Sequence, residues 1–309
     1  MNNKLTIVLT TYNRPKSLKS AIDSILFQSF KYFKLVILDN GSNKETSNLI
    51  MSYNDNRIEY IKNDVNDLEF LNRAFTFTKL KYLMITHDDD TMEEGLIERH
   101  ISKMDSDNRI GLISSSINLI NNQGYKLNKV RPRLKKDKRW TKEQFIQDYF
   151  FKGDIIPCPA SIFRSSIIIE NKFNYEWKVG PAVDLYLLFK INMLNHHIYL
   201  FKKPLYNYRI HQKQDSEKNR ILLEYKVRPH IVKLLTNKNL YKYVKKYEQA
   251  SLGIILQIIL NNFFIGVFSF NELKRQINRL KNEGLRINFI SLYWFLFGTM
   301  RGLKNFLFR

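Results

Sequence analysis

Short apolar runs rich in β-branched residues alternate with amphipathic segments over the first ninety residues of the chain. The apolar runs are Leu5–Leu9, Leu35–Leu38 and Tyr82–Ile85, and the segment Arg57–Ile61 is interpreted as a further strand. Between the first two of them, Leu18, Ala21, Ile22 and Ile25 recur at helical spacing after a proline, Pro15, that suits a first helical turn. Continuous apolar strands that alternate with helices are typical of a parallel sheet with helices on both faces. The sequence therefore predicts an α/β fold with a mostly parallel sheet.

Polar clusters follow the predicted strands at the points where they end. The four clusters are Thr10–Asn13, Asp39–Ser42, Asn63–Asp64 and His87–Asp90. In open α/β sheets, ligands bind beyond the carboxyl ends of the strands. One such cluster alone is ordinary loop chemistry, but four that open on the same edge predict a binding site.

The most unusual of these clusters is His87-Asp88-Asp89-Asp90. Three adjacent carboxylates repel one another, and a divalent cation removes that repulsion. Mg²⁺ and Mn²⁺ prefer oxygen ligands, often one or two carboxylates together with substrate phosphates. The alternative is a solvated acidic turn that ends a strand.

No glycine-rich phosphate loop occurs anywhere in the 309 residues. The phosphates of a bound nucleotide would therefore need another counter-charge, which a metal ion held by Asp88–Asp90 would supply. Tyr12 can stack on a base, and Asp39 can accept hydrogen bonds from a base or a ribose. This set of residues predicts a nucleoside diphosphate pocket held by a metal ion.

The net charge of +21 calls for an anionic partner. Residues 126–142 carry nine Lys and Arg against one Asp, and residues 216–309 carry 17 against five Glu. We considered nucleic acid, an anionic membrane and phosphorylated substrates. No zinc-finger spacing or RNA-recognition signature is present, so nucleic acid is not expected. A single cysteine, Cys158, and the lack of a signal-peptide pattern predict a cytoplasmic protein.

Four motifs resemble, in order and spacing, those of the family 2 glycosyltransferases with a GT-A fold. They are Thr11-Tyr12-Asn13-Arg14, Asp39-Asn40-Gly41-Ser42, Asn72-Arg73-Ala74 and the cluster Asp88-Asp89-Asp90. The resemblance covers about residues 4–215. The resemblance implies a nucleotide-sugar donor, with UDP as the preferred nucleotide. It also implies Mn²⁺ or Mg²⁺ as cofactor and inversion at the anomeric carbon.

The resemblance also implies roles for particular residues. Base recognition falls to Thr11, Tyr12 and Asp39, and the other expected donor-pocket residues of the first half are Asn13, Arg14, Asn72 and Asp88. The family's Asp-x-Asp motif aligns in two ways. If His87 takes the first position, Asp89 is the metal ligand; if Asp88 does, Asp90 is. We prefer Asp88 and Asp90 as metal ligands and retain Asp89 as a third candidate. We interpret His87 as a hydrogen-bonding residue in preference to a metal ligand.

Two motifs in the second half extend the resemblance. The family's acidic pair is replaced by Pro181-Ala182-Val183-Asp184, so Asp184 is the one carboxylate left as catalytic base. Its alternative role is a helix N-terminal Asp stabilised by the helix dipole. The segment Tyr206–Gln212 resembles the family's closing motif, in which Arg209 and His211 reach the diphosphate and His211 also the metal.

We expect a glycosyltransferase domain over residues 1–215 and a basic, aromatic-rich helical region over residues 216–309. Residues 241–270 and 289–308 have the composition of amphipathic helices on an anionic membrane, or alternatively of a dimer interface or a helical cap. The segment 126–142 is either a mobile loop or a flap over phosphates.

The predicted function is sugar transfer to a glycan or lipid-linked glycan acceptor in bacterial cell-surface polysaccharide synthesis. The alternative is a non-catalytic protein that binds membrane or nucleic acid on a degenerate transferase fold. A nucleotidyltransferase is a third alternative, because it would also use a metal ion bound to a diphosphate.

Overall fold

The computed structural model describes residues 2–152, 156–180, 182–210, 220–237, 239–286 and 288–307. The chain divides into two compact units. The first comprises Met1–Lys142, Ile156–Trp177 and Leu194–His211, and the second comprises Glu143–Ile155, Lys178–Met193 and Gln212–Arg309. The division at residue 215 stays a prediction.

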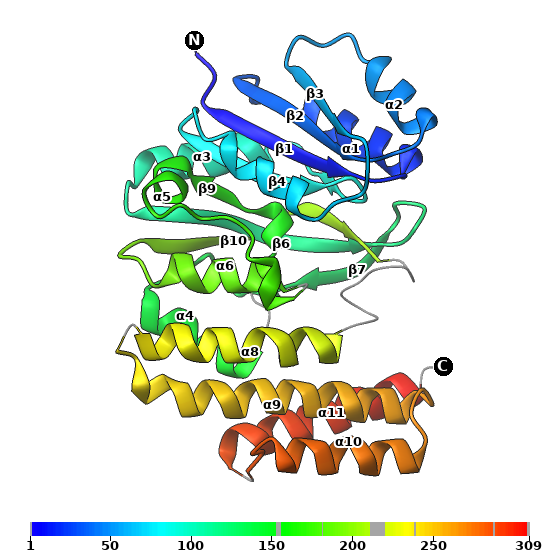
Figure 1. The fold of residues 1–309 in the computed structure, drawn as a ribbon, viewed down its shortest axis with the longest axis vertical. Coiled ribbons are helices and arrows are strands. Elements are labelled where there is room, and N and C mark those ends of the chain that lie inside the picture. The colour runs from blue at the N-terminus through cyan, green and yellow to red at the C-terminus, as the bar shows by residue number, and fades with distance from the viewer. Residues whose placement is uncertain are drawn as a thin grey trace. The chain divides into compact units, whose positions relative to one another are not determined.

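A mixed sheet of ten strands forms the centre of the first unit (Figure 1). Its main path runs in the order β3 (Ile58–Asn63), β2 (Phe33–Asn40), β1 (Leu5–Thr11), β4 (Tyr82–His87), β9 (Ile162–Arg164), β6 (Ile110–Ile120), β10 (His197–Arg209) and β5 (Thr91–Met92). Strands β3, β2, β1 and β4 are parallel, as are β6 and β10, while β9 is antiparallel to both of its neighbours. The predicted α/β fold with a mostly parallel sheet is confirmed.

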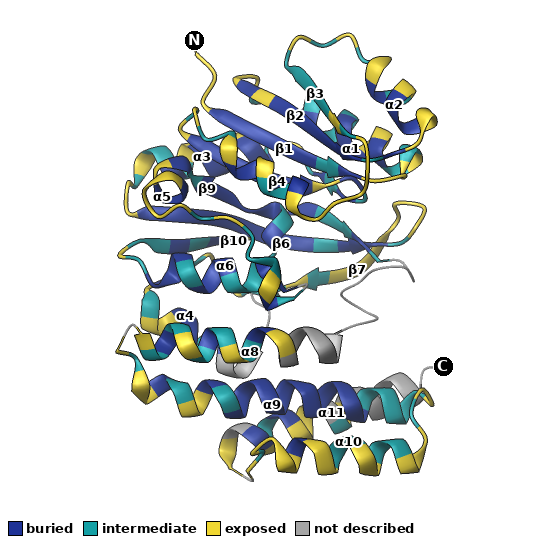
Figure 2. Cartoon of the chain, in the orientation of Figure 1, coloured by how far each residue is buried: buried dark blue, intermediate teal, exposed yellow. Residues whose placement is uncertain are grey.

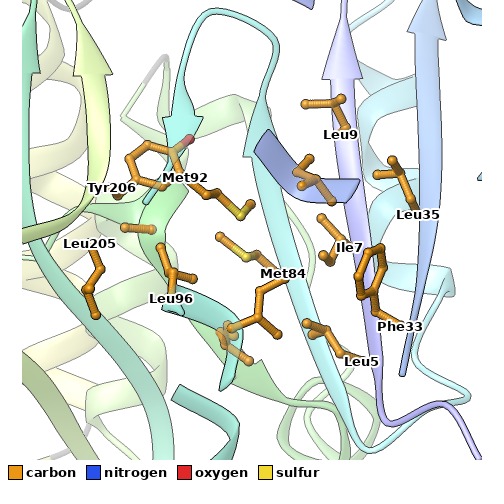
Figure 3. Close-up of a cluster of buried hydrophobic side chains, with 14 of the residues drawn as sticks. Leu5, Ile7, Leu9, Phe33, Leu35, Met84, Met92, Leu96, Leu205 and Tyr206 are labelled. Atoms are coloured by element: carbon orange, nitrogen blue, oxygen red, sulfur yellow. The ribbon is translucent and has the colours of Figure 1, made fainter. Parts of the chain in front are cut away.

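Helices cover this sheet because its strands are apolar on both faces. In β1, Leu5, Ile7 and Leu9 point into one core, and Val8, which faces the other way, is equally buried. Side chains of β2, β4 and β10 complete that core with those of α1 (Pro15–Leu26) and α3 (Leu96–Ser106) (Figure 3). Helix α2 (Lys44–Met51) follows β2, and the side chain of its N-cap residue, Asn43, accepts a hydrogen bond from the Thr46 N–H.

Two segments differ from what the sequence predicts. The alternation of strands and helices predicts a helix before the Tyr82–Ile85 strand, and this segment is a 3₁₀ helix, η1 (Glu69–Thr76). The basic segment 126–142 is not a loop: it contains β7 (Lys126–Arg131), paired with β6, and β8 (Lys138–Trp140), paired with β10. Pairing with long neighbouring strands supplies the backbone hydrogen bonds of both segments. The charged side chains of β7 are exposed to solvent and do not oppose this pairing.

The second unit is helical. Its helices are α4 (Lys142–Lys152), α6 (Val183–Asn192), α8 (Arg220–Asn237), α9 (Tyr241–Phe264), α10 (Phe270–Asn282) and α11 (Phe289–Leu307). Helix α9 is buried continuously from Gln249 to Leu260 (Figure 2). A Cβ atom on Gly253 would lie 2.6 Å from Cδ1 of Trp294, so the small residue allows α11 to approach α9 closely. No helix in the described ranges is long and apolar enough to span a bilayer.

Candidate active site at the carboxyl ends of β1, β2 and β4

The order of the strands brings three polar strand ends together. Strand β1 lies between β2 and β4, with Thr11 in register with Asp39 on one side and Thr10 in register with His87 on the other. Segments that are distant in sequence therefore meet at one edge of the sheet. We call residues Asp88–Asp90, which follow β4, the acidic turn.

Asp88 is held inside this edge by donors from β1 and the residues after it. Its Oδ2 accepts hydrogen bonds from the Thr11 hydroxyl at 2.7 Å and from the Tyr12 N–H at 3.2 Å, and its Oδ1 contacts Arg14 Nη1 at 3.0 Å. Burial raises the pKa of Asp88, while the Thr11 hydrogen bond and the Arg14 charge oppose that rise. Asp88 thus fastens the acidic turn to the end of β1.

Asp90 is fastened on the other side, to β10. Its Oδ1 accepts a hydrogen bond from the backbone N–H of Arg209 at 2.8 Å, and its Oδ2 accepts one from the Tyr206 hydroxyl at 3.1 Å. That hydroxyl also lies 2.6 Å from Oγ1 of Thr86. Burial and the neighbouring charge of Asp89 raise the pKa of Asp90 well above its usual range. Burial and Asp90 do the same to the pKa of Tyr206.

Asp89 is the most accessible carboxylate of the turn. Its side chain is 15% exposed, compared with 3% for that of Asp88. Its Oδ2 lies 3.1 Å from Nη1 of Arg14, and the Arg14 side chain is itself 44% exposed. Asp89 and Arg14 therefore form an ion pair at the surface of the site, above two buried carboxylates.

The guanidinium of Arg209 links the acidic turn to the turn between β6 and β7. Its Nε donates to the Asp89 carbonyl at 2.6 Å, and its Nη1 donates to the carbonyls of Asn121 and Asn122 at 2.9 Å each. The side chain predicted to reach a diphosphate is thus engaged in organising the turn. His211, the other residue of that motif, lies outside the described residues.

The end of β2 supplies a second buried carboxylate site. Asp39 accepts hydrogen bonds from the Ser42 N–H at 2.8 Å and from the Tyr60 hydroxyl at 2.7 Å. Burial and the Asp39 hydrogen bond raise the pKa of Tyr60 to about 12. Asp39 is itself 0% exposed, so its predicted contact with a base or ribose stays a prediction. Tyr12, at the end of β1, is 44% exposed, so its ring is available for stacking.

Asn13 lies beside these residues, and Asn72 binds a different part of the first unit. The Asn13 N–H donates to Ser42 Oγ at 2.9 Å, and its Oδ1 accepts from the Asn43 N–H at 2.8 Å, so it joins the ends of β1 and β2. Asn72, on η1, pairs with the backbone N–H and C=O of Tyr175 at 2.9 and 3.1 Å. That pairing ties η1 to the segment after α5 (Ser165–Glu170).

Asp184 stands in the first turn of α6, which belongs to the second unit. Its helix position agrees with the N-terminal placement expected from sequence. Its role as a base stays a prediction.

Motif reasoning missed several residues that the structure brings to the site. A cleft of about 450 Å³ is bordered by Asn13, Arg14, Lys16, Asn122, Gln123 and Arg209, among others. The sequence motif includes Tyr206, the anchor of Asp90, only as the first residue of the segment Tyr206–Gln212 and predicts no role for it. No sequence pattern indicates Asn122 and Gln123 as site residues, because only the pairing of β6 with β7 and β10 brings their turn to Arg209.

The donor groups of the acidic turn suit a cation that completes its coordination with ligand oxygens. The described residues contain no cluster of three or more His, Cys, Asp or Glu side chains arranged around one metal position. Asp88 and Asp90 already accept protein hydrogen bonds on both oxygens, which leaves Asp89 as the most accessible ligand. Mg²⁺ sites of this type use one or two carboxylates and take further oxygens from phosphates and water.

Comparison with known sequences places this chain among the glycosyltransferases. The model of Glycosyl transferase family 2 matches residues 6–168. An uncharacterized glycosyltransferase of Methanocaldococcus jannaschii is 31% identical over 58% of this chain and 61% of its own length. The GalNAc(5)-diNAcBac-PP-undecaprenol β-1,3-glucosyltransferase of Campylobacter jejuni is 25% identical over 69% of this chain and 66% of its own. The O-antigen biosynthesis glycosyltransferase WbnJ of Escherichia coli is 24% identical over 69% and 82%.

The matches span 61% to 65% of the length of the first three curated relatives. None of the comparisons supports the alternative of a non-catalytic binding protein.

Solved structures agree on the fold. Staphylococcus aureus TarS 1–349, solved with UDP-GlcNAc, matches 98% of this chain and 89% of its own with a TM-score of 0.67 and 15% identity. The mannosyltransferase PcManGT of Pyrobaculum calidifontis, solved with GDP-Man and Mn²⁺, matches 99% and 88% with a TM-score of 0.58 and 13% identity. At these identities the likeness establishes the GT-A fold alone.

Proposed function

We propose, because this chain belongs to Glycosyl transferase family 2, that it transfers a sugar from a nucleoside diphosphate donor to a hydroxyl of a glycan acceptor with inversion. The acidic turn carries this proposal. It exposes Asp89 between two buried, anchored carboxylates, at the sheet edge that also holds Tyr12 and Asp39.

UDP is the preferred nucleotide of the donor. Tyr12 offers an exposed ring for the base. The base-recognition roles of Thr11 and Asp39, which are buried at the same sheet edge beside Asn13, are part of this proposal. The TarS structures contain UDP-GlcNAc or UDP, which supports this choice, whereas the PcManGT structure contains GDP-Man. The nucleotide is therefore a proposal that a binding assay must test.

Metal dependence is the second part of the proposal. Asp89 would hold Mn²⁺ or Mg²⁺ together with the phosphates of the donor, with Asp88 and Asp90 positioning the turn; His211 remains a predicted further ligand. When bound, the cation would stabilise the charge that develops on the diphosphate leaving group. Arg14, which pairs with Asp89, adds positive charge at the same place.

The acceptor hydroxyl needs a base. Asp184 would take its proton as the hydroxyl oxygen attacks the anomeric carbon and the bond to the diphosphate oxygen breaks on the opposite side. The acceptor class rests on two relatives, one named for O-antigen biosynthesis and one named for a PP-undecaprenol glycan. We infer a glycan acceptor of bacterial surface polysaccharide synthesis, carried on a lipid.

A panel of labelled UDP-sugars and GDP-sugars, incubated with Mn²⁺, Mg²⁺ or EDTA, tests the proposal. We expect hydrolysis or transfer of a UDP-sugar with metal and loss of turnover with EDTA. Asp89→Asn should abolish that turnover, whereas Glu170→Gln, an exposed carboxylate on α5, should not change it. Turnover that is equal in EDTA would contradict the metal requirement. Tight nucleic-acid binding without any turnover would contradict the proposal that the protein is an enzyme.

A further inference from the structure

The outward face of α11 in the second unit is apolar. Among the side chains of this helix that the structure describes, the exposed ones are Phe289, Leu292, Phe295, Leu296, Phe297 and Met300, with exposed fractions from 42% to 75%. At about 100° per residue, these positions cover roughly 200° of the helix surface. A helix that packs on a soluble bundle normally turns polar residues to solvent. Helix α11 therefore presents an apolar surface where water is expected.

The opposite side of α11 accounts for its packing within the unit. Trp294 and Ser291 are buried, and Trp294 packs against Gly253 of α9. Helix α10 shows the usual arrangement, since its exposed positions include Lys274, Arg275 and Arg279. The apolar face of α11 is thus additional to what the helical bundle uses for its own stability.

The charged residues that lie near this helix in sequence have one sign. Residues 284–309 contain four Lys and Arg, namely Arg286, Arg301, Lys304 and Arg309, and no Asp or Glu. An apolar helix face with cations near it in sequence complements a surface that is apolar inside and anionic outside, which is the arrangement of an anionic lipid leaflet. A second copy of the chain is a poorer complement, because it brings the same cations and the same net charge of +21.

We propose that α11 lies in the interface of an anionic lipid membrane, with its apolar face at the acyl boundary and the flanking cations against lipid phosphates. The helix would lie along the membrane, because no helix in the described part of the chain meets the length and hydropathy of a span. This inference does not rest on glycosyl transfer. If the acceptor is lipid-linked, the same surface would bring the protein to it.

Flotation of the full chain with vesicles tests the proposal, using phosphatidylglycerol–phosphatidylcholine vesicles and pure phosphatidylcholine vesicles. The test variant is Leu292→Gln with Leu296→Gln, which keeps the charge. The matched control is Met51→Gln with Ile169→Gln, two similarly exposed apolar residues of the first unit. We expect partitioning to anionic vesicles to fall by about tenfold or more in the α11 variant and to stay unchanged in the control.

Salt provides an independent test of the charge component. Raising NaCl from about 0.1 M to about 1 M shortens the screening length from about 10 Å to about 3 Å, so binding should weaken strongly. Equal partitioning of the α11 variant and the wild type would overturn the proposal, as would equal binding to neutral vesicles. A lipid-free dimer in light scattering that the α11 variant converts to a monomer would assign the face to a second copy and also overturn it. Circular dichroism and urea unfolding verify that each variant is folded.

Discussion

At the scale of single residues, the acidic turn places three identical side chains in different environments. Asp88 and Asp90 are each 2% exposed and accept two or more hydrogen bonds from the protein, whereas Asp89 lies nearer the solvent. A buried carboxylate with satisfied oxygens is a structural anchor, and an accessible one can bind a ligand. The three positions should therefore respond differently to substitution.

We predict that Asp89→Asn lowers kcat by at least about 10²-fold, the scale of losing one transition-state charge contact, and leaves the fold intact. Asp90→Ala should instead lower stability by about 2–4 kcal/mol, since it leaves the buried Tyr206 hydroxyl and Arg209 N–H short of an acceptor. Calorimetry with UDP and Mn²⁺, combined with urea unfolding, separates the two effects. If Asp89→Asn lowers the free energy of unfolding as much as Asp90→Ala does, Asp89 is also a structural anchor.

A second residue-scale prediction concerns His100, which is fully buried on α3. Its Nδ1 lies 2.7 Å from the Leu96 carbonyl, and burial lowers its pKa from 6.5 to about 3. The folded state therefore holds His100 neutral, while the unfolded state binds a proton below about pH 6.5. The contribution of neutral His100 to the free energy of unfolding is present in full above pH 6.5 and is lost as pH falls toward 3.

Between pH 7.5 and 5.0 this residue alone should remove about 2 kcal/mol from the free energy of unfolding. Urea unfolding at the two pH values measures the change. His100→Leu should show a pH dependence smaller by that amount, because the other titrating groups remain. If the wild type and the variant lose equal stability, His100 is not the source.

At the scale of elements, the turn after β2 depends on one glycine. Gly41 has φ of +87°, and a Cβ atom there would lie 2.6 Å from the backbone carbonyl carbon of Val65. Gly95, at φ +77° before α3, has nothing within 4 Å of the same position. The two glycines share the backbone conformation and differ only in steric room, so they form a matched pair.

We predict that Gly95→Ala costs about 1 kcal/mol of stability from backbone conformation alone. Gly41→Ala should cost about 3 kcal/mol or more, because the neighbouring backbone must also move. It should also weaken UDP binding, since Asp39 and Ser42 belong to the same turn. Equal losses in the two variants, measured by denaturant unfolding, would show that the turn relaxes freely.

The first turn of α6 carries the prediction for the base. Asp184→Asn keeps the size of the side chain and removes its ability to take a proton, so kcat should fall by about 10²–10⁴-fold. UDP-sugar affinity should stay within a few-fold of wild type, because a base acts on the acceptor. The comparison variant is Glu176→Gln, the next carboxylate upstream. If that variant shows the larger loss of kcat, the base role moves to Glu176.

At the scale of the whole molecule, ligand binding should appear as added stability. A ligand that binds only the folded chain stabilises it by about 2.7 kcal/mol at a hundred times its Kd. UDP with Mn²⁺ should therefore raise the melting temperature, and UDP with EDTA should not. Asp89→Asn should lose the metal-dependent shift. An equal shift with and without metal would indicate that the protein holds the diphosphate through its own cations, Arg14 among them.

The sequence by itself determined the parts of this protein that depend on local chemistry. Apolar strands, helical spacing and turn residues identified β1, β2, β3 and β4, the helix α1 and the polar clusters at the strand ends. The family was also evident from motifs in the first ninety residues. These features are readable because period and turn preferences act over a few neighbouring positions.

Tertiary structure alone decided how the acidic turn is used. The donors that bury Asp88 and Asp90 come from Thr11, Tyr206 and Arg209, at separations of 77, 116 and 119 residues along the chain. No local pattern distinguishes one Asp of the three, and our preference for Asp88 and Asp90 as ligands could not include these contacts. In the same way, the basic segment 126–142 contains strands because β6 and β10 offer it hydrogen bonds. Those partners are settled by the packing of the whole sheet.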